Sequence, residues 1–194
     1  MGRPREFDEE QVVDLARDAF WANGIAATSI SDLSEATGLS VGSIYKAFEN
    51  KAALCHRTLD TYLDEGLAAT IDVLESGPTP LDGINAYLDV VATRAGDRSP
   101  TRGCYAVGVA MELAATDEPV RRRLRAHDRK LRAAVRRALA NAVADGQLDC
   151  DPERGARLLT TAVNGVQVEA RKGIRRDEAR DILDMALSAL DRAG

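Results

Sequence analysis

The segment from residue 28 to 54, TSISDLSEATGLSVGSIYKAFENKAAL, constrains the fold most, because it predicts two short helices joined by a glycine turn. Ser29 followed by Asp32 fits a capping box, and the apolar residues that come next recur at helical spacing. Gly38 is expected to end the first helix, since glycine readily adopts the left-handed conformation that closes a helix. Ser40 is a natural N-cap for the second helix. The segment therefore predicts a helix-turn-helix.

The second of these helices, about residues 41–48, carries two different faces. Ile44 and Phe48 share one face on a 3.6-residue period, which is expected to be buried. The opposite face is the one that DNA would meet, because small residues permit close approach, hydroxyls bond bases or phosphates, and lysine neutralises a phosphate. Lys51, at the positive end of the next helix, is a second expected phosphate contact. The residues expected at DNA are Ser40, Val41, Gly42, Ser43, Tyr45, Lys46 and Lys51.

Residues of this region also stand in the order and spacing of a known family. They are Ala16, Ala19, Phe20, Gly24, the Thr28–Ser29 cap, Gly38-Leu39-Ser40, Gly42, the Ile44–Tyr45 pair, Phe48, Lys51 and Leu54. With them, the chain from residue 12 to 54 resembles the N-terminal domain of the tetracycline-repressor (TetR/AcrR) family of bacterial transcription regulators. The resemblance adds Thr28 and Ser29 to the expected DNA-contacting set. Ala47 departs from the family, which often has histidine or an aromatic residue there, so one phosphate contact is lost.

Helical periodicity continues through the rest of the chain, without a strand pattern or an internal repeat. Further helices are expected over about residues 8–23, 50–75, 81–95, 104–115, 117–145, 151–172 and 177–192. The fold class is therefore all-α, with about nine helices. The resemblance implies a division into a helix-turn-helix DNA-binding domain of three helices, residues 1–50, and a larger helical ligand-binding and dimerisation domain, residues 51–194.

The charge of the chain argues only against strong non-specific DNA binding. The net charge is −5 and the pI is about 5.2, whereas affinity for DNA rests largely on neutralised phosphates. Distribution matters more than the total, because Lys46 and Lys51 are expected at the duplex. Arg3 and Arg5 either reach phosphates or a minor groove, or belong to a solvated tail. The arginine-rich helix over residues 117–145 is interpreted as a solvated face, with a second nucleic-acid surface as the alternative.

Several function classes lack their residues in this sequence. Cys55, Cys104 and Cys150 are far apart and lack the spacing of metal ligands, so neither a metal nor a cofactor is expected. Neither paired carboxylates, a nucleophile–base constellation nor a phosphate loop stands out, so an enzyme is not expected. The chain lacks the run of about 20 apolar residues that would span a membrane, and its first residues lack the apolar core of a secretion signal. We expect a cytoplasmic protein.

The predicted larger domain offers candidates for binding a small molecule. They are aromatic, soft or polar residues within apolar helices: Tyr87, Cys104, Tyr105, Met111, His127, Asn164 and Gln167. Core packing is the alternative role for each of them. Cys104 carries a sharper hypothesis, because some related regulators with a cysteine at the start of this helix sense electrophiles or oxidants. A helix N-terminus stabilises a thiolate, although a lone cysteine in a helical core commonly acts as a small apolar residue.

The last two predicted helices have apolar surfaces rich in small residues, which favour close helix packing. The family resemblance implies that they pair with their equivalents across a twofold axis, and packing within one subunit is the alternative. The residues expected at this interface are Leu158, Leu159, Ala162, Val163, Val166, Ile182, Ala186, Ala189 and Leu190. The sequence thus predicts a homodimeric repressor that binds a palindromic double-stranded DNA operator and is released by an unknown small-molecule effector. The rival is a helical small-molecule-binding protein without a DNA role.

Overall fold

The computed structural model describes residues 7–96 and 103–190 of the chain. Within these residues it has nine helices and no strand, so the predicted all-α fold is confirmed. The helices are α1 (Glu9–Asn23), α2 (Ile30–Thr37), α3 (Val41–Phe48), α4 (Lys51–Glu75), α5 (Pro80–Gly96), α6 (Tyr105–Leu113), α7 (Glu118–Ala144), α8 (Pro152–Ala170) and α9 (Arg176–Ser188). The predicted Arg3/Arg5 arm and the predicted end of the last helix near residue 192 lie outside the described residues.

Polar side chains fix the starts of most helices. An acidic or amide side chain accepts backbone N–H groups at the start of α1, α4, α7 and α8, which satisfies donors that have no partner inside the helix. These caps are Asp8, Asn50, Asp117 and Asp151. Pro80 begins α5, and the N–H of Asp82 donates to the hydroxyl of Thr79 at 3.2 Å. The predicted helix starts therefore agree with the observed ones within one or two residues.

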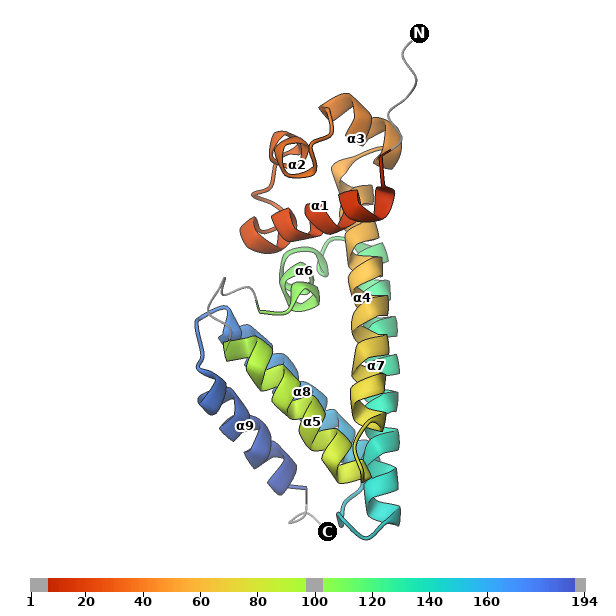
Figure 1. Ribbon diagram of the computed structural model, residues 1–194, viewed down its shortest axis with the longest axis vertical. Helices are drawn as coiled ribbons and strands as arrows, with labels where there is room; N and C mark the ends of the chain where they lie inside the picture. The colour runs from red at the N-terminus through yellow and green to blue at the C-terminus, as the bar shows by residue number, and fades with distance from the viewer. Residues whose placement is uncertain (1–6, 97–102, 191–194) are drawn as a thin grey trace.

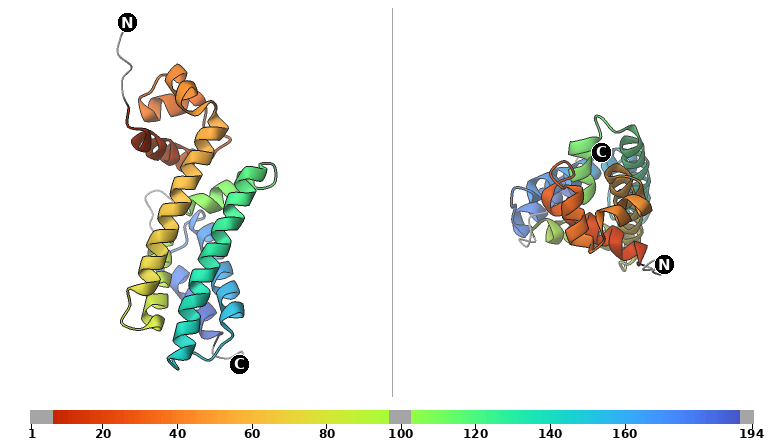
Figure 2. Two further views of the ribbon diagram at one scale, coloured as in Figure 1. Left: turned by 90° about the vertical axis from the view of Figure 1, so that its right-hand side faces the viewer. Right: turned by 90° about the horizontal axis from the view of Figure 1, so that it is seen from above.

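Two long helices give the molecule its elongated shape. Figures 1 and 2 show α4 running from the group α1–α3 at one end to the opposite end of the molecule, with α7 beside it over most of that length. One apolar core lies among the lower part of α4 and α5, α7, α8 and α9. A second core surrounds α1–α3 and the first half of α4. Because α4 contributes to both cores, it links them rigidly.

The second core extends beyond the predicted domain boundary after residue 50. Tyr105, Ala106 and Val109 of α6 and Val120 of α7 are buried in it together with residues of α1–α4. Met111, which lies in α6 and has core packing as its alternative predicted role, is 70% exposed. Helix α6 therefore packs beneath the N-terminal helices and against α4, α7 and α8, and leaves the side that carries Met111 in solvent.

Candidate nucleic-acid interface

Helix α2 begins at the predicted capping box. The N–H of Asp32 donates to the Ser29 hydroxyl at 3.1 Å, and the N–H of Ser29 donates to the Asp32 carboxylate at 2.7 Å. The hydrogen bond that the carboxylate accepts from the Ser29 N–H, followed by the interaction with the Ser29 hydroxyl, lowers the pKa of Asp32 below its ordinary value. The carboxylate stays ionised, and α2 has a defined first residue.

The turn between α2 and α3 is built by glycine and by hydroxyl groups. Gly38 has φ 69°, in the left-handed region, so the chain can reverse there without the strain that a side chain would bring. The Ser34 hydroxyl donates to the Leu39 carbonyl at 2.6 Å. The Ser40 hydroxyl then accepts the Ser43 N–H at 3.1 Å and caps α3. The angle between the two helices is thereby fixed by local bonds.

Helix α3 has the two faces that its sequence predicts. Ile44 and Phe48 are buried in the core around α1–α4, while Tyr45 is 48% exposed. A Cβ placed on Gly42 would meet no atom closer than 4.0 Å, so the space outside this residue is open. Figure 1 shows α2 and α3 at the end of the molecule far from the C-terminus. The exposed residues of α3 are Val41, Gly42, Tyr45, Lys46 and Ala47, with Ser43 half-buried.

Two of the residues predicted to contact DNA are placed differently. Thr28 is fully buried, and its hydroxyl donates to the Gly24 carbonyl at 2.7 Å, so its side chain faces the interior. The Lys51 ammonium donates to the carbonyls of Ile25 and Thr28, at 2.7 Å each. Two of its three N–H donors are therefore used inside the protein. In the structure Lys51 holds the turn before α2. Sequence periodicity could not predict that the carbonyls of this turn lie next to its ammonium group.

A contact that the sequence did not indicate comes from α6. The Ala26 N–H donates to the carboxylate of Glu112 at 2.9 Å, so the turn between α1 and α2 is held from a helix 86 residues away. Nearby, Trp21 of α1 lies against Tyr62 of α4 and Tyr105 of α6, with ring centroids 5.4 and 5.9 Å away. Aromatic pairs at these separations stabilise the contact beyond the area they bury. The position of the DNA-facing helices thus depends on α4 and α6.

The predicted ligand-binding residues do not line one common cavity. Met111 and Asn164 are exposed, and Tyr105 is buried in the core around α1–α4, where its hydroxyl bonds that of Thr58 at 2.8 Å. His127 lines a cavity of about 170 Å³ between α4 and α7. Burial lowers the pKa of His127, more than the neighbouring Asp128 and Asp64 raise it.

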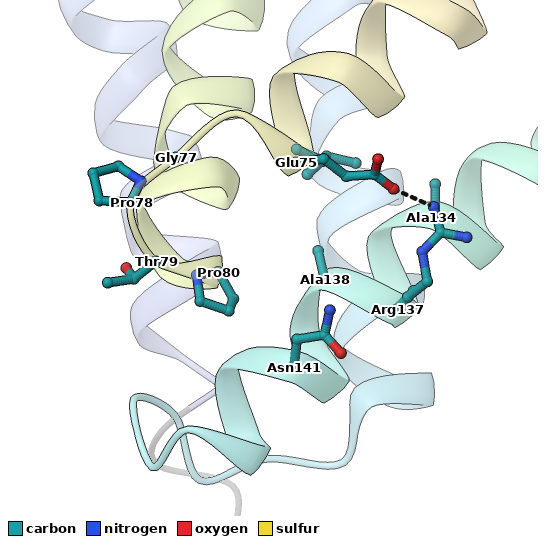
Figure 3. A pocket seen from close by; sticks show the side chains of 10 residues that line it. Glu75, Gly77, Pro78, Thr79, Pro80, Ala134, Arg137, Ala138 and Asn141 are labelled. Atoms are coloured by element: carbon teal, nitrogen blue, oxygen red, sulfur yellow. Dashed lines mark hydrogen bonds and ion pairs between the residues drawn. The ribbon is translucent and has the colours of Figure 1, made fainter.

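The larger described cavity, about 230 Å³, lies where α4 ends and turns into α5, against α7 (Figure 3). None of the predicted ligand-binding residues lines it. Figure 3 shows the ion pair of Glu75 with Arg137, 2.7 Å long, at one side of this cavity, and Asn141 below it. The cavity is therefore open and polar at its edge, at the end of the molecule away from α3.

Polar groups of α4, α5 and α6 meet inside the larger domain. The hydroxyl of Tyr62 and the sulfur of Cys104 lie 3.5 Å apart, within hydrogen-bond distance. Tyr87 of α5 is buried, with 5% of its surface exposed. Burial, followed by the nearby Cys104 sulfur, raises the pKa of the Tyr62 and Tyr87 phenols, which are neutral at physiological pH. Tyr62 and Tyr87 are thus both neighbours of Cys104, and the backbone carbonyl of Gln167 lies close to Gly103, the residue before it.

The residues predicted at a dimer interface divide into two sets. Leu159, Val163, Val166 and Leu190 are buried in the core of their own subunit. Leu158 on α8 and Ile182 and Ala189 on α9 are exposed, and Ala162 and Ala186 are half-buried. Met185, which the sequence analysis did not single out, is 66% exposed and lies one turn after Ile182. Apolar side chains are therefore exposed on both α8 and α9, and the buried residues hold these helices in place.

Within the described residues, His, Cys, Asp and Glu form no group of three or more that could hold a metal ion. The described helices also include none that combines the length and the apolar character needed to cross a membrane.

Comparison with known families gives two matches that together cover most of the chain. Residues 12–58 match the family model for "Bacterial regulatory proteins, tetR family". Residues 80–186 match the model for "Tetracyclin repressor-like, C-terminal domain".

Individual relatives agree with the family models. The HTH-type transcriptional repressor ComR of Escherichia coli K12 is 26% identical over 189 residues, which are 96% of this chain and 90% of ComR. A cysteine mutant of the TetR family transcriptional regulator CifR, solved in complex with a 26-bp double-strand operator DNA, is 30% identical. It superimposes with a TM-score of 0.85 over 97% of this chain and 100% of CifR. The reduced form of E. coli NemR, 19% identical, shares the fold with a TM-score of 0.82 over 92% of this chain and 94% of NemR.

Proposed function

This chain belongs to the tetracycline-repressor family of bacterial transcriptional regulators, and we propose that it is a homodimeric repressor released from a palindromic operator by a small-molecule effector. As a member of the family, it is a DNA-binding transcriptional regulator and not an enzyme. An operator is a chromosomal site, so the proposed place of action is the cytoplasm.

The observation that carries the proposal is the open face of α3. Val41, Gly42, Tyr45 and Lys46 are exposed on it, and the buried Ile44 and Phe48 anchor the opposite face. The Val41 side chain suits a thymine methyl group, the hydroxyl of Tyr45 can bond a base or a phosphate, and Lys46 can neutralise a phosphate. Ser29, Ser40 and Ser43 lie near the ends of α2 and α3, where phosphate oxygens would approach. The proposed DNA-contacting set therefore omits Thr28, which is buried, and Lys51, whose ammonium bonds carbonyls of the protein.

A gel-shift assay against the intergenic DNA beside the protein's own gene tests this role. Binding is expected to a fragment with an inverted repeat and to be weakened, but still measurable, in Tyr45→Ala and Lys46→Ala. The log–log salt slope of Lys46→Ala should be shallower by about one, because one phosphate contact is removed. Wild-type protein that binds no fragment, or a Lys46→Ala slope equal to that of the wild type, would contradict the proposal.

The proposed dimer uses the outer sides of α8 and α9. Leu158, Ile182 and Met185 are large apolar side chains left in solvent, and a Cβ placed on Gly165 would meet no atom within 4 Å, so another helix can approach closely. Two copies would place their α3 helices about 34 Å apart, one turn of the duplex. Each helix alone buries little surface on DNA, and two together read a palindrome.

Sedimentation at micromolar concentration tests the dimer. The wild type is expected to have twice the mass of one chain, and Ile182→Glu is expected to be monomeric, because a carboxylate would be buried at the interface. Met111→Glu is the control, since it alters another large apolar residue that is exposed, on α6. A monomeric wild type, or an Ile182→Glu variant that stays dimeric, would show that these helices do not pair.

Release by an effector is proposed as a population shift. A ligand that binds only a conformation with wrongly spaced α3 helices lowers operator affinity by its differential affinity for the two states. The proximity of Tyr87 to Cys104 supports an effector contact there, more than at Met111, His127 or Asn164. In the alternative, an oxidant or electrophile modifies the Cys104 thiol, and the loss of its contact with Tyr62 carries the signal. A Cys104→Ser protein that hydrogen peroxide still releases from DNA would reject this alternative.

A further inference from the structure

The turn between α1 and α2 lies between two oppositely charged side chains. From α4, the ammonium of Lys51 donates to the carbonyls of Ile25 and Thr28. From α6, the carboxylate of Glu112 accepts the N–H of Ala26 at 2.9 Å. Both contacts are charge-assisted hydrogen bonds, because the ammonium donates to carbonyl oxygens and the carboxylate accepts from an amide N–H. The turn is therefore clamped from two helices that do not belong to the helix-turn-helix.

Gly24 leaves room for the Glu112 side of this clamp. It has φ 88°, and a Cβ placed on it would lie 3.0 Å from a carboxylate oxygen of Glu112. Glycine is therefore favoured here for two reasons: it adopts the positive φ at the end of α1 without strain, and its lack of a Cβ lets the carboxylate approach closely.

The other end of α6 is held by the larger domain. A Cβ placed on Gly108 would lie 2.4 Å from a guanidinium nitrogen of Arg171, at the end of α8, and one placed on Gly103 would lie 2.7 Å from the Gln167 carbonyl. The end of α8 therefore packs directly on the backbone of α6. Helix α6 lies between α8 and the turn that precedes α2, and the ribbon in Figure 1 places it there.

We propose that Glu112 is a positioning residue for DNA binding, which ties the orientation of α2 and α3 to the place of α6. The turn between α1 and α2 leads directly into α2. Because the turn at Gly38 fixes the angle between α2 and α3, the orientation of α3 follows that of α2. When α6 shifts relative to the turn, either α2 and α3 follow or the Ala26 amide loses its partner. This inference rests on DNA binding through α3, and it adds a contact through which the larger domain acts on that helix.

Whether removal of the Glu112 carboxylate raises or lowers the affinity for DNA distinguishes a positioning role from a purely electrostatic one. Removing the Glu112 carboxylate makes the protein less negative, so charge alone predicts tighter binding to any DNA. A positioning role predicts weaker binding to the operator and no loss on a scrambled duplex of equal length. Because a phosphate contact is not removed, the salt slope stays at the wild-type value.

The experiment compares Glu112→Ala and Glu112→Gln with Glu118→Ala, an exposed carboxylate of α7 that pairs locally with Arg121. Operator affinity of Glu112→Ala is expected to fall about fivefold, the equivalent of about 1 kcal/mol for one lost hydrogen bond. Glu112→Gln keeps an acceptor oxygen and should stay within about twofold of wild type. Glu118→Ala should bind at least as tightly as wild type.

Hydrogen exchange of the Ala26 amide, followed by NMR without DNA, gives a readout that does not depend on the operator. It is expected to accelerate about fivefold in Glu112→Ala and to be unchanged in Glu118→Ala. Unchanged exchange in Glu112→Ala would overturn the clamp. Faster exchange with operator affinity equal to that of Glu118→Ala would overturn the positioning role while leaving DNA binding intact.

Discussion

Lys51→Met distinguishes a lysine that holds the fold from a lysine that contacts DNA. The wild-type ammonium makes two hydrogen bonds of 2.7 Å to the carbonyls of Ile25 and Thr28, and its residue is half-buried. Methionine retains the apolar stem and removes only the donors. Hydrogen bonds to charged groups contribute about 1.5–3 kcal/mol each in general, and we take about 2–3 kcal/mol for the pair because the site is partly solvated.

For a chain of this length, each kcal/mol corresponds to about 2–4 °C in melting temperature, so Lys51→Met should melt about 5–10 °C below wild type. Lys46→Met is the matched control, because Lys46 is exposed on α3 and has no described partner. Thermal unfolding followed by circular dichroism should show no shift for Lys46→Met, and its DNA-binding salt slope should fall by about one. A Lys51→Met protein with the melting temperature of wild type and a shallower salt slope would refute the structural role and restore the phosphate contact.

Three further predictions concern the larger domain and the core. Gly83→Ala should destabilise the protein by at least about 2 kcal/mol, since the new Cβ would lie 2.2 Å from the Leu74 carbonyl. Gly66→Ala places its Cβ in open space within α4 and should stabilise the protein by about 0.5–1 kcal/mol. Urea unfolding measures both changes. Burial lowers the pKa of His127, so the unfolded chain binds more protons at this residue than the folded chain does. The free energy of unfolding should therefore decrease as the pH drops below about 6.5. In urea unfolding at pH 7.5 and 5.5, His127→Gln should show a smaller decrease than wild type. Burial raises the pKa of the Cys55 thiol to about 11, so Cys55 should react with a thiol reagent at pH 8 only when denaturant is added.

Local patterns predicted the helix-turn-helix because the bonds that define it are local. The capping box of Ser29 and Asp32, the left-handed Gly38 and the Ser40 cap join residues no more than a few positions apart. The helical period predicted that Ile44 and Phe48 are buried and that Tyr45 and Lys46 are exposed, and the structure agrees. For such elements the sequence contains both partners of each contact within one window.

Contacts between distant segments were not predictable in this way. Glu112 resembles any exposed helical glutamate until the fold brings the Ala26 amide to it. Lys51 stands where a phosphate contact was expected, and only the three-dimensional path of the turn shows that carbonyls occupy its donors. Met111 fitted an apolar helix, but the packing of α6 leaves the side that carries Met111 in solvent. Each difference arises from packing partners far away in the chain.

The place of Trp21 makes movement of the DNA-facing end visible without any label. It is the sole tryptophan of the chain, and its indole lies edge to face with Tyr62 of α4 and beside Tyr105 of α6. Its fluorescence therefore originates where α1, α4 and α6 meet. The emission wavelength and quenching of one native chromophore should change when this junction opens, so compounds can be screened by optical titration before any operator has been identified.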